Sequence, residues 1–372
     1  MSTEKITINV SEHLQQLAQE LADYKNARIK CGIIGRSGTG KSSLINAIAG
    51  QEIAQVDEIE STKSISEAYE QNGLLIYDLP GASTERFPKE TYLRTMKVDE
   101  LDCVIFVTSD RFYEDDKFLI TEINKIPVPI FLVRSKMDIS ISQAKKRGVE
   151  ESETLTKIYN NIRESVIDCK YKGIYLTSSE YPTEYDLGRL LSDISKNLSD
   201  IKKEKFLSAV SVSSQEILNE KEKIAEWLVI RYSALAAANG LNPIPGLDIS
   251  VDIGLLLKMT SDIAAIFGLT RENLKRLEDI TGSAKMKLLT GKVGQFLVKF
   301  GSKEGIIILL KKYVAAETTK SIGKWLPFVG QALSATIGYL LTSNMGKEIL
   351  NESKLLAEEL FENLKNDAND AL

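Results

Sequence analysis

The sequence predicts an α/β domain with a mostly parallel sheet and a phosphate-binding loop, joined to an all-helical domain. Between residues 28 and 200, β-branched apolar runs alternate with helical stretches, which is typical of a parallel sheet covered by helices. A glycine-rich loop at residues 35–42 stands between the first run and a helix-forming segment. Beyond residue 200 helical periodicity replaces the strand rhythm. We therefore expect residues 201–372, with an N-terminal helix in residues 1–27, to form the helical domain.

The composition is that of an ordinary soluble chain with room for two domains. The 372 residues are 43% hydrophobic and 27% charged, which allows a large buried core. The formal net charge of −5 argues against bulk nucleic-acid binding. The cysteines number three, and this odd count fits reduced thiols in a cytosolic protein. No secretory pattern opens the chain, and Ser2 stands where N-myristoylation requires glycine, so we expect a cytoplasmic location.

The expected elements follow in chain order. A helix is expected over residues 11–25 with Ser11 as its N-cap, because apolar side chains recur there at helical spacing. The expected strands are Ile29–Ile34, Leu74–Asp78, Leu101–Thr108, Val128–Val133 and Gly173–Leu176. In the helical half, breaks are expected at residues 242–246, at Gly268, at Gly301 and at residues 325–327.

A complete phosphate-binding loop is the most informative motif of the chain. Residues 35–42 read G-x-x-x-x-G-K-S, after an expected strand and before an expected helix. Such a loop aims backbone N–H groups and the positive end of a helix dipole at one spot, where a polyphosphate can sit. Lys41 is expected to reach the outer phosphates and the Ser42 hydroxyl to bind Mg²⁺. The nucleotide contacts expected here are Gly35, Ser37, Gly38, Thr39, Gly40, Lys41, Ser42 and Ser43.

Two further motifs decide which nucleotide is bound. Asp78 closes an expected strand, and Gly81 follows three residues later. The carboxylate is suited to hold Mg²⁺ through water, and the glycine N–H is suited to meet the γ-phosphate. Asp138, in the motif at residues 135–138, can accept hydrogen bonds from the N1 and N2 donors of guanine while the Lys136 stem covers the ring. Adenine lacks that donor pair, so we expect GTP and GDP as ligands, with Mg²⁺ as cofactor.

The base-contacting residues come from two loops. Ser135, Lys136 and Asp138 form the first loop, and Ser178 and Ser179 stand where the second is expected, after the last strand. Each motif alone is weak, because an Asp-x-x-Gly is usually a turn and a Ser-Lys-x-Asp is usually a solvated helix start. Their order, spacing and placement at strand ends make the combination specific.

The first switch should supply a metal-sensing hydroxyl between the phosphate loop and Asp78. Spacing alone leaves four candidates, which are Ser61, Thr62, Ser64 and Ser66. Ala82 follows Gly81, where small GTPases carry the glutamine that orients the attacking water. We therefore expect the isolated chain to hydrolyse GTP no faster than ~10⁻⁴ to 10⁻³ s⁻¹, until a partner acts in trans.

Several blocks of the chain resemble the immunity-related GTPases. These blocks are residues 78–84, 87–88, 91–97, 108–112 and 131–138, and the similarity continues through residues 185–187, 244–247 and 266–269. The resemblance covers nearly the whole chain, and Thr91–Lys97 with Arg111-Phe112 is its most specific part. It implies a dynamin-like, self-assembling GTPase whose helical domain is built from both chain ends. Members dimerise through their nucleotide faces and act on intracellular membranes.

The same resemblance implies roles for single residues. Residues 59–62 match the family's first-switch pattern, which makes Thr62 the Mg²⁺-sensing hydroxyl and Glu60 a catalytic carboxylate near the γ-phosphate. Arg111 matches a basic residue that reaches the partner's nucleotide. Lys41 places the chain in the subclass that keeps lysine in the loop. The catalytic set implied is Lys41, Glu60, Thr62, Gly81 and Arg111, and the metal set is Ser42, Thr62 and Asp78.

The chain also departs from the family pattern. Tyr113 and Glu114 stand where basic residues usually follow Arg-Phe, which leaves open whether Arg111 acts in trans. Ser135 replaces the usual threonine, so looser contacts to the base are expected.

The helical half carries a basic stretch and an uncharged stretch. Residues 325–345 hold 21 residues without charge, enough to span ~30 Å of hydrocarbon. Their proline and polar residues favour a helix buried in protein. Residues 281–324 hold nine Lys against two Glu. We hypothesise reversible contact of Lys285–Lys324 with an anionic membrane surface, and the alternative is lysines on the solvated faces of helices.

These observations predict a Mg²⁺-dependent GTPase that is slow alone, activated by nucleotide-dependent dimerisation or oligomerisation, and peripheral on intracellular membranes. The expected partners are GTP or GDP, a second copy at the nucleotide face and a membrane surface, without nucleic acid. The alternative is a GTP-gated switch that captures a partner and uses hydrolysis as a timer. A ribosome-assembly GTPase is disfavoured by the acidic balance of the chain.

Overall fold

The computed structural model describes residues 3–55, 68–81, 91–240, 253–271, 273, 275, 284–318 and 331–371. Contacts between Cα atoms divide the chain into two compact units. The sheet unit comprises Ala27–Ile217 and Phe361–Leu372, and the helical unit comprises Met1–Asn26 and Leu218–Leu360. Each unit combines segments that lie far apart in the sequence.

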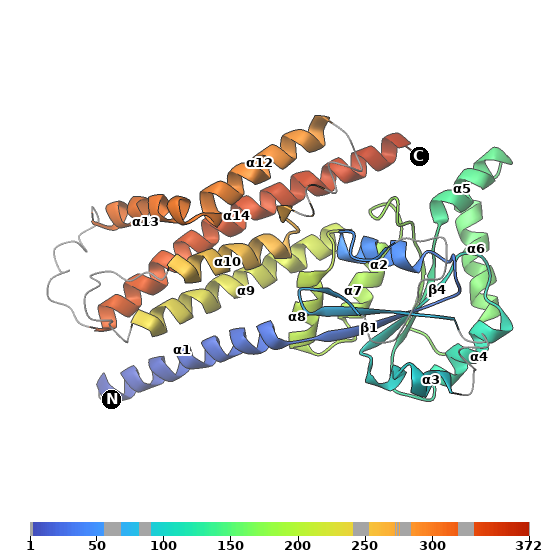
Figure 1. The fold of residues 1–372 in the computed structure, drawn as a ribbon, viewed down its shortest axis with the longest axis horizontal. Coiled ribbons are helices and arrows are strands. Elements are labelled where there is room, and N and C mark those ends of the chain that lie inside the picture. Colours follow the sequence, from blue (N-terminus) through green and yellow to red (C-terminus); the bar gives the residue numbers. More distant parts are fainter. Residues whose placement is uncertain are drawn as a thin grey trace. The chain divides into compact units, whose positions relative to one another are not determined.

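The sheet unit is built on one six-stranded sheet (Figure 1). Its strands are β1 (Ile29–Ile34), β2 (Tyr69–Gln71), β3 (Leu74–Leu79), β4 (Cys103–Thr108), β5 (Ile130–Arg134) and β6 (Ile174–Leu176), in the order β2-β3-β1-β4-β5-β6. Only the β2–β3 pair is antiparallel among these strands. The expected mostly parallel sheet is confirmed. The carboxyl ends of its five parallel strands meet at one edge, where ligands of such sheets bind.

The degree of burial explains why the sequence predicted the central strands but not the edge strand β2. Every residue of β4 and β5 is buried, so these central strands form continuous apolar runs. The edge strand β2 was not expected. It has three residues, of which Glu70 is exposed and Tyr69 and Gln71 are half-buried, and a segment this short carries no readable periodicity.

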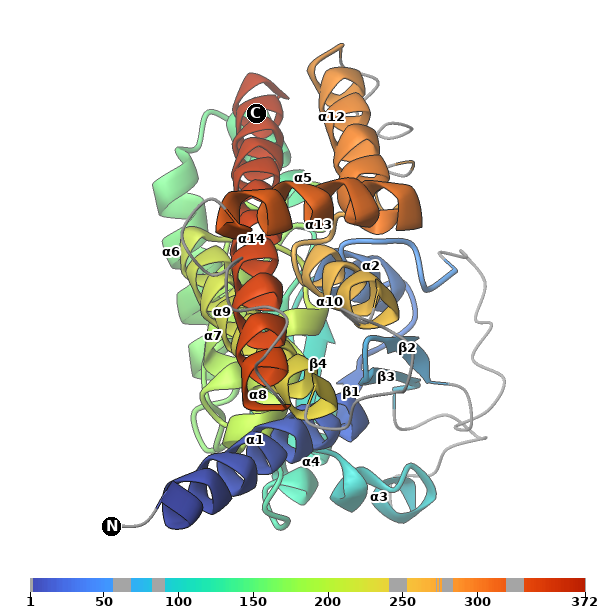
Figure 2. The ribbon, with the colours of Figure 1, turned by 90° about the vertical axis from the view of Figure 1, so that its left-hand side faces the viewer.

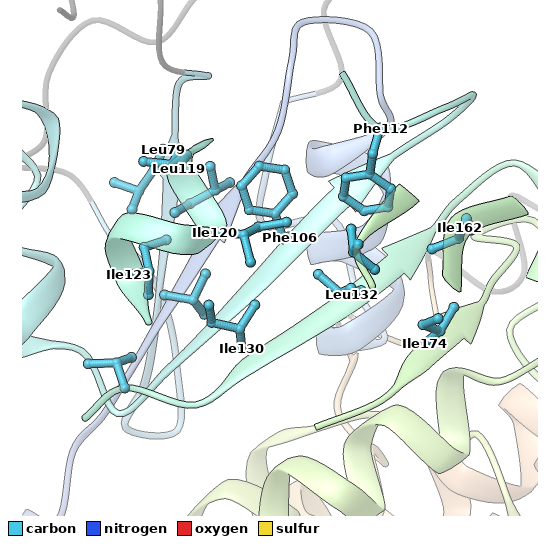
Figure 3. Packing of buried hydrophobic residues seen from close by; sticks show 14 of the residues in the cluster. Leu79, Phe106, Phe112, Leu119, Ile120, Ile123, Ile130, Leu132, Ile162 and Ile174 are labelled. Carbon is cyan, nitrogen blue, oxygen red and sulfur yellow. The ribbon is translucent and has the colours of Figure 1, made fainter. Parts of the chain in front are cut away.

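Helices cover the sheet and fix its carboxyl edge. They are α2 (Lys41–Ala49), α3 (Tyr92–Thr95), the 3₁₀ turn η1 (Val98–Glu100), α4 (Glu114–Ile123), α5 (Met137–Lys146), α6 (Glu151–Ser165), α7 (Leu187–Ser195) and α8 (Asp200–Ala209). In the core, Leu119, Ile120 and Ile123 of α4 lie against Phe106 of β4 and Ile130 of β5 (Figure 3). All five are at most 2% exposed, so this close packing holds the start of α4 at the carboxyl edge.

The α8 helix belongs to the sheet unit, although the sequence analysis placed it in the helical domain. The Gln71 side-chain amide donates to the Ala209 carbonyl at 2.7 Å. The backbone N–H of Ser211 donates to the Ile48 carbonyl at 2.7 Å. The sheet unit therefore extends past residue 200. Helical periodicity begins at α8, but its contacts are with the sheet.

The helical unit contains α1 (Thr3–Asn26), most of α9 (Gln215–Gly240), α10 (Ile253–Ile266), α12 (Ala284–Gly301), α13 (Lys303–Thr318) and most of α14 (Gln331–Ala371). Within it, α9, α10 and α14 pack side by side (Figure 2). A Cβ built on Gly346 of α14 would lie 2.7 Å from Val229 of α9 and 3.2 Å from the Met259 sulfur of α10. Glycine therefore permits the close approach of these helices.

The first helix is longer than the sequence analysis expected. It begins at Thr3, so Ser11 lies inside it and is not its N-cap. No glycine or proline precedes Ser11, and nothing in the sequence stops the helix there. Tyr24 of α1 packs on Trp227 of α9 with ring centroids 5.1 Å apart, which gives the amphipathic helix its partner surface.

Two of the expected helix breaks fall within the described residues. Gly268, at φ +73°, follows the end of α10, as expected of a left-handed helix terminus. Gly301 is the last residue of α12. The breaks expected at residues 242–246 and 325–327 lie outside the described residues. Among the helices described, none has both the length and the apolar character needed to cross a bilayer.

Candidate nucleotide-binding site

The phosphate loop joins β1 to α2 in a conformation that requires glycine. Gly38 and Gly40 have φ angles of +75° and +83°, which L side chains rarely adopt. A Cβ on Gly35 would lie 2.4 Å from the Val107 carbonyl oxygen, so this position has no room for a side chain. The loop ends at the N-terminus of α2, where the first N–H groups face outward as donors for an anion.

The loop is closed around the carbonyl oxygen of Arg36. The Thr39 hydroxyl donates to this oxygen at 2.8 Å, and the Lys41 ammonium donates to it at 3.3 Å. Thr39 is 7% exposed. The loop is therefore preformed, with a lysine donor held at its opening.

Asp78 lies beside this lysine at the end of β3. Its Oδ1 lies 3.8 Å from the Lys41 Nζ, too far for a hydrogen bond. The same oxygen is buried and has no hydrogen-bond partner in the structure. Burial raises the pKa of Asp78, and the charge of Lys41 opposes this rise. A buried carboxylate oxygen without a partner fits a site that hydrated Mg²⁺ completes.

The residues around Asp78 place the other candidate phosphate contacts. Ser42 is the second residue of α2. Gly81 stands against the loop, since a Cβ there would lie 3.5 Å from the Arg36 Cα. The buried Tyr92 hydroxyl of α3 donates to the Pro80 carbonyl. This bond fixes the Asp-x-x-Gly turn from a residue in the most specific block of the family resemblance.

The first base loop is tied directly to the phosphate loop. The Ser135 hydroxyl lies 2.5 Å from the Thr39 carbonyl oxygen and 3.2 Å from the Thr108 carbonyl oxygen. The Lys136 ammonium donates to the Gly38 carbonyl at 2.7 Å. Lys136 has a φ of +58°, an uncommon conformation outside glycine, and α5 begins immediately after it. Ser135 thus holds the two loops together.

Asp138 and Ser178 meet across the two base loops. The Ser178 hydroxyl donates to Asp138 Oδ1 at 2.8 Å and accepts the Tyr181 backbone N–H at 3.1 Å. The Met137 N–H donates to the Thr177 carbonyl at 3.1 Å. Ser178 is 1% exposed. The Asp138 carboxylate, which the sequence predicts to read the base, is therefore oriented by a buried hydroxyl that itself accepts the Tyr181 N–H.

The remaining predicted site residues are placed as follows. Ser37 is exposed in the phosphate loop, Ser43 is half-buried in the first turn of α2, and Ser179 is half-buried after β6. Arg111 is exposed, with its guanidinium 5.0 Å from the Tyr113 ring centroid. Glu60 and Thr62, with the other first-switch candidates Ser61, Ser64 and Ser66, lie outside the described residues.

The structure adds a cluster that the sequence analysis did not use. Arg36 lies over the Tyr113 ring and pairs with Asp116. Burial raises the pKa of Asp116, and its bond from the Tyr113 N–H and the charge of Arg36 oppose this rise. The sequence itself showed only an arginine at one of the unspecified positions of the G-x-x-x-x-G-K-S motif. Within the described ranges, no group of three His, Cys, Asp or Glu side chains could hold a metal ion by itself.

The fold and these loops define the class of the protein, a P-loop GTPase. The family profile described as "Interferon-inducible GTPase (IIGP)" matches residues 4–350. The chain belongs to this family, which confirms the resemblance to the immunity-related GTPases.

Two curated relatives and one solved structure show how far the similarity extends. Interferon-gamma-inducible GTPase 10 of Mus musculus is 26% identical over 270 residues, which cover 69% of this chain and 64% of the relative. Interferon-inducible GTPase 5 of Bos taurus is 24% identical over 363 residues, which cover 92% of this chain and 77% of the relative. Among solved structures, the FeoB G-domain of Methanococcus jannaschii is 21% identical, with a TM-score of 0.28, and covers 47% of this chain and 99% of that one.

Proposed function

We propose that the chain binds GTP with Mg²⁺ and hydrolyses it to GDP and phosphate. The observation that carries this proposal is the meeting of three loops at one sheet edge. Lys41 lies 3.8 Å from Asp78, and Lys136 donates to Gly38 at 2.7 Å. The phosphate loop therefore has Asp78 on one side and the loop that carries Lys136 and Asp138 on the other.

Different residues of the chain are proposed to bind the phosphates, the guanine base and Mg²⁺. Lys41 and the N–H groups of the loop hold the phosphates, and the Gly81 N–H meets the γ-phosphate. Asp138 selects guanine, with Ser178 fixing its orientation. Ser42, Thr62 and Asp78 would hold Mg²⁺, which when bound neutralises charge on the phosphates.

Assembly of two copies through the nucleotide face is the proposed route to faster hydrolysis. Ala82 stands where a water-orienting glutamine would be, so the isolated chain is expected to be slow. Arg111 is exposed and is the side chain proposed to reach the nucleotide of a second copy, and Glu60 is the proposed catalytic carboxylate. The second candidate function is a GTP-gated switch that captures a partner, favoured by the same missing glutamine.

Reversible membrane-surface contact is proposed for α12 and α13. The exposed lysines there are Lys285, Lys287, Lys292, Lys303, Lys311 and Lys312. Leu288, Val298 and Ile308 are 64%, 64% and 67% exposed, so apolar side chains accompany the lysines. Lys292 pairs with Glu359 at 2.7 Å, so at least one of these lysines is partly neutralised within the unit.

Two experiments test this function. Calorimetry with GTP, GDP and ATP, with and without Mg²⁺, should show saturable binding of the guanine nucleotides only. Phosphate release against protein concentration, beside light scattering, separates the candidates. Specific activity that rises steeply with concentration supports assembly-activated catalysis, and flat, slow turnover supports the switch.

The membrane contact is tested separately. Charge reversal of Lys285, Lys287, Lys303, Lys311 and Lys312 should abolish co-sedimentation with anionic liposomes. Reversal of five exposed lysines of the sheet unit is the matched control. Unchanged sedimentation of the first variant would remove the membrane proposal and leave GTP hydrolysis intact.

A further inference from the structure

The side chain of Arg36 is held by the start of α4. Its guanidinium carbon lies 3.8 Å from the centroid of the Tyr113 ring. Its Nε lies 3.5 Å from Asp116 Oδ1, and its Nη2 lies 3.9 Å from Asp115 Oδ2. The binding roles described above do not use this arginine, although it stands inside the phosphate loop.

The backbone of Arg36 is fixed, whereas its side chain is held weakly. Thr39 and Lys41 both donate to its carbonyl oxygen. Its guanidinium makes one cation–π contact and two long ion pairs, and the side chain is 42% exposed. Such contacts contribute little at exposed sites. The guanidinium can therefore exchange these contacts for an anion that binds it more strongly, while the Arg36 backbone stays in place.

The backbone of Arg36 lies next to the place proposed for the γ-phosphate. A Cβ on Gly81 would lie 3.5 Å from the Arg36 Cα, and the Gly81 N–H is the group proposed to meet that phosphate. The Arg36 Cα therefore lies near the proposed position of the phosphate, which an arginine side chain is long enough to reach from there. A phosphate binds a guanidinium through two parallel, charge-assisted hydrogen bonds, which an aromatic ring cannot offer.

We propose that Arg36 is a catalytic arginine supplied in cis, stored on Tyr113 and Asp116 without nucleotide and transferred to the γ-phosphate of bound GTP. This role rests on the proposed function. The arginine stabilises negative charge on the phosphoryl group during transfer and takes part in no covalent step. Tyr113 and Asp116 are positioning residues, because they act only through the place they give the guanidinium.

Variants that release the arginine and variants that remove it should act in opposite directions. Tyr113→Ala and Asp116→Asn release it. Asn at position 116 can still accept the Tyr113 N–H, which Asp116 Oδ2 accepts at 3.0 Å. At concentrations where light scattering shows monomers, each release variant should raise single-turnover hydrolysis several-fold, because a larger share of the bound GTP then has the arginine at its γ-phosphate. Arg36→Ala should lower it, and the whole span between these variants should stay within roughly 20- to 30-fold, the ratio between a GTPase with a cis arginine and an unassisted one. The double variant Arg36→Ala with Tyr113→Ala should lose this rise.

Nucleotide affinity gives a readout that does not depend on turnover. The release variants should bind a nonhydrolysable GTP analogue several-fold more tightly than the wild type, because no stored contact has to break first. Their affinity for GDP should stay unchanged, since GDP has no γ-phosphate. Tyr159→Ala, which removes an aromatic side chain of α6 that is 39% exposed, is the matched control and should change neither affinity.

The outcomes separate this role from the function on which it rests. If Arg36→Ala, Tyr113→Ala and Asp116→Asn all lower the rate, the cluster is a structural brace and the stored arginine is wrong. A rise that survives in the double variant overturns it as well. If the wild type binds no GTP, the proposed function fails. If the wild type binds and hydrolyses GTP and the release variants do so at its rate, only the stored arginine fails.

Discussion

The phosphate end and the base end of the candidate site differ in how far the protein itself satisfies their carboxylates. At the base end, Asp138 accepts the Ser178 hydroxyl at 2.8 Å. At the phosphate end, Asp78 Oδ1 is buried without a hydrogen-bond partner, and burial raises the pKa of this group. The base loops are thus preorganised by the fold, whereas the phosphate end is left for a ligand to complete. Ligand binding should therefore stabilise the phosphate end more than it stabilises the base end.

Asp138→Asn should have the largest effect and tests the base end. The amide has one acceptor oxygen and cannot accept both guanine donors, so GTP affinity should fall about 10²- to 10³-fold. Affinity for xanthosine triphosphate should rise, because its ring offers an acceptor to the amide donor. Calorimetry with both nucleotides measures this exchange, with the exposed Asp168→Asn as the matched control. Retained guanine preference would place base reading in another residue.

Lys41→Ala should follow in size and tests the phosphate end. It removes a charge-assisted donor to the outer phosphates, so affinity should fall about 10²-fold for GTP and for xanthosine triphosphate alike. In the Asp138→Asn background the loss should be of the same size, because the two ends contact different parts of the ligand. Lys146→Ala, at the exposed end of α5, serves as the control. A loss confined to one base would contradict the division into two ends.

Ser178→Ala should have a smaller effect, because it only removes the group that orients Asp138. Guanine preference over adenine should weaken about 10-fold, the effect of one hydrogen bond to a charged group. Ser165→Ala, which removes a hydroxyl bonded to a helix carbonyl, controls for loss of a serine. Competition binding of GTP against ATP measures the ratio. An unchanged ratio would mean that Asp138 keeps its orientation without Ser178, and the base end would not be preorganised as described.

The two ends also differ in what the sequence could reveal. The convergence of Lys41, Asp78 and Asp138 was predictable, because the carboxyl ends of parallel strands meet at one edge. The bond from Lys136 to Gly38 was not, since it joins side chain and backbone 98 positions apart and depends on a left-handed residue that no local pattern requires. Arg36 was missed because its partners lie on another element.

In the fold, too, elements marked by a local sequence pattern were predictable, and elements that depend on contacts with distant residues were not. Fully buried strands such as β4 stood out as apolar runs. The three-residue strand β2 did not, because it is an edge strand that forms only through its pairing with β3. The assignment of α8 to the sheet unit likewise depends on contacts with distant residues, such as the bond from Gln71 to Ala209.

Asp78→Asn should have the smallest effect. In the ligand-free chain this substitution should stabilise the folded state. The pKa of folded Asp78 is raised above its ordinary value of 3.8, so the folded state holds the proton more tightly than the unfolded state does. Its contribution to stability is therefore fully present below pH 3.8 and is lost as pH rises through the raised folded pKa. An amide has no such loss, and it should raise the free energy of unfolding at pH 7 by about 1 kcal/mol.

Urea unfolding at a series of pH values measures this change, with Asp168→Asn, a substitution at an exposed carboxylate, as the matched control. The gain from Asp78→Asn should grow across the window above pH 3.8 and then stay constant, because both states of the wild type are then ionised. With saturating Mg²⁺ and GTP the order should reverse, because the wild-type carboxylate regains its partner and the amide does not. If the variant is less stable than the wild type without ligand at pH 7, Asp78 is already satisfied by the protein. The contrast between the two ends would then be lost.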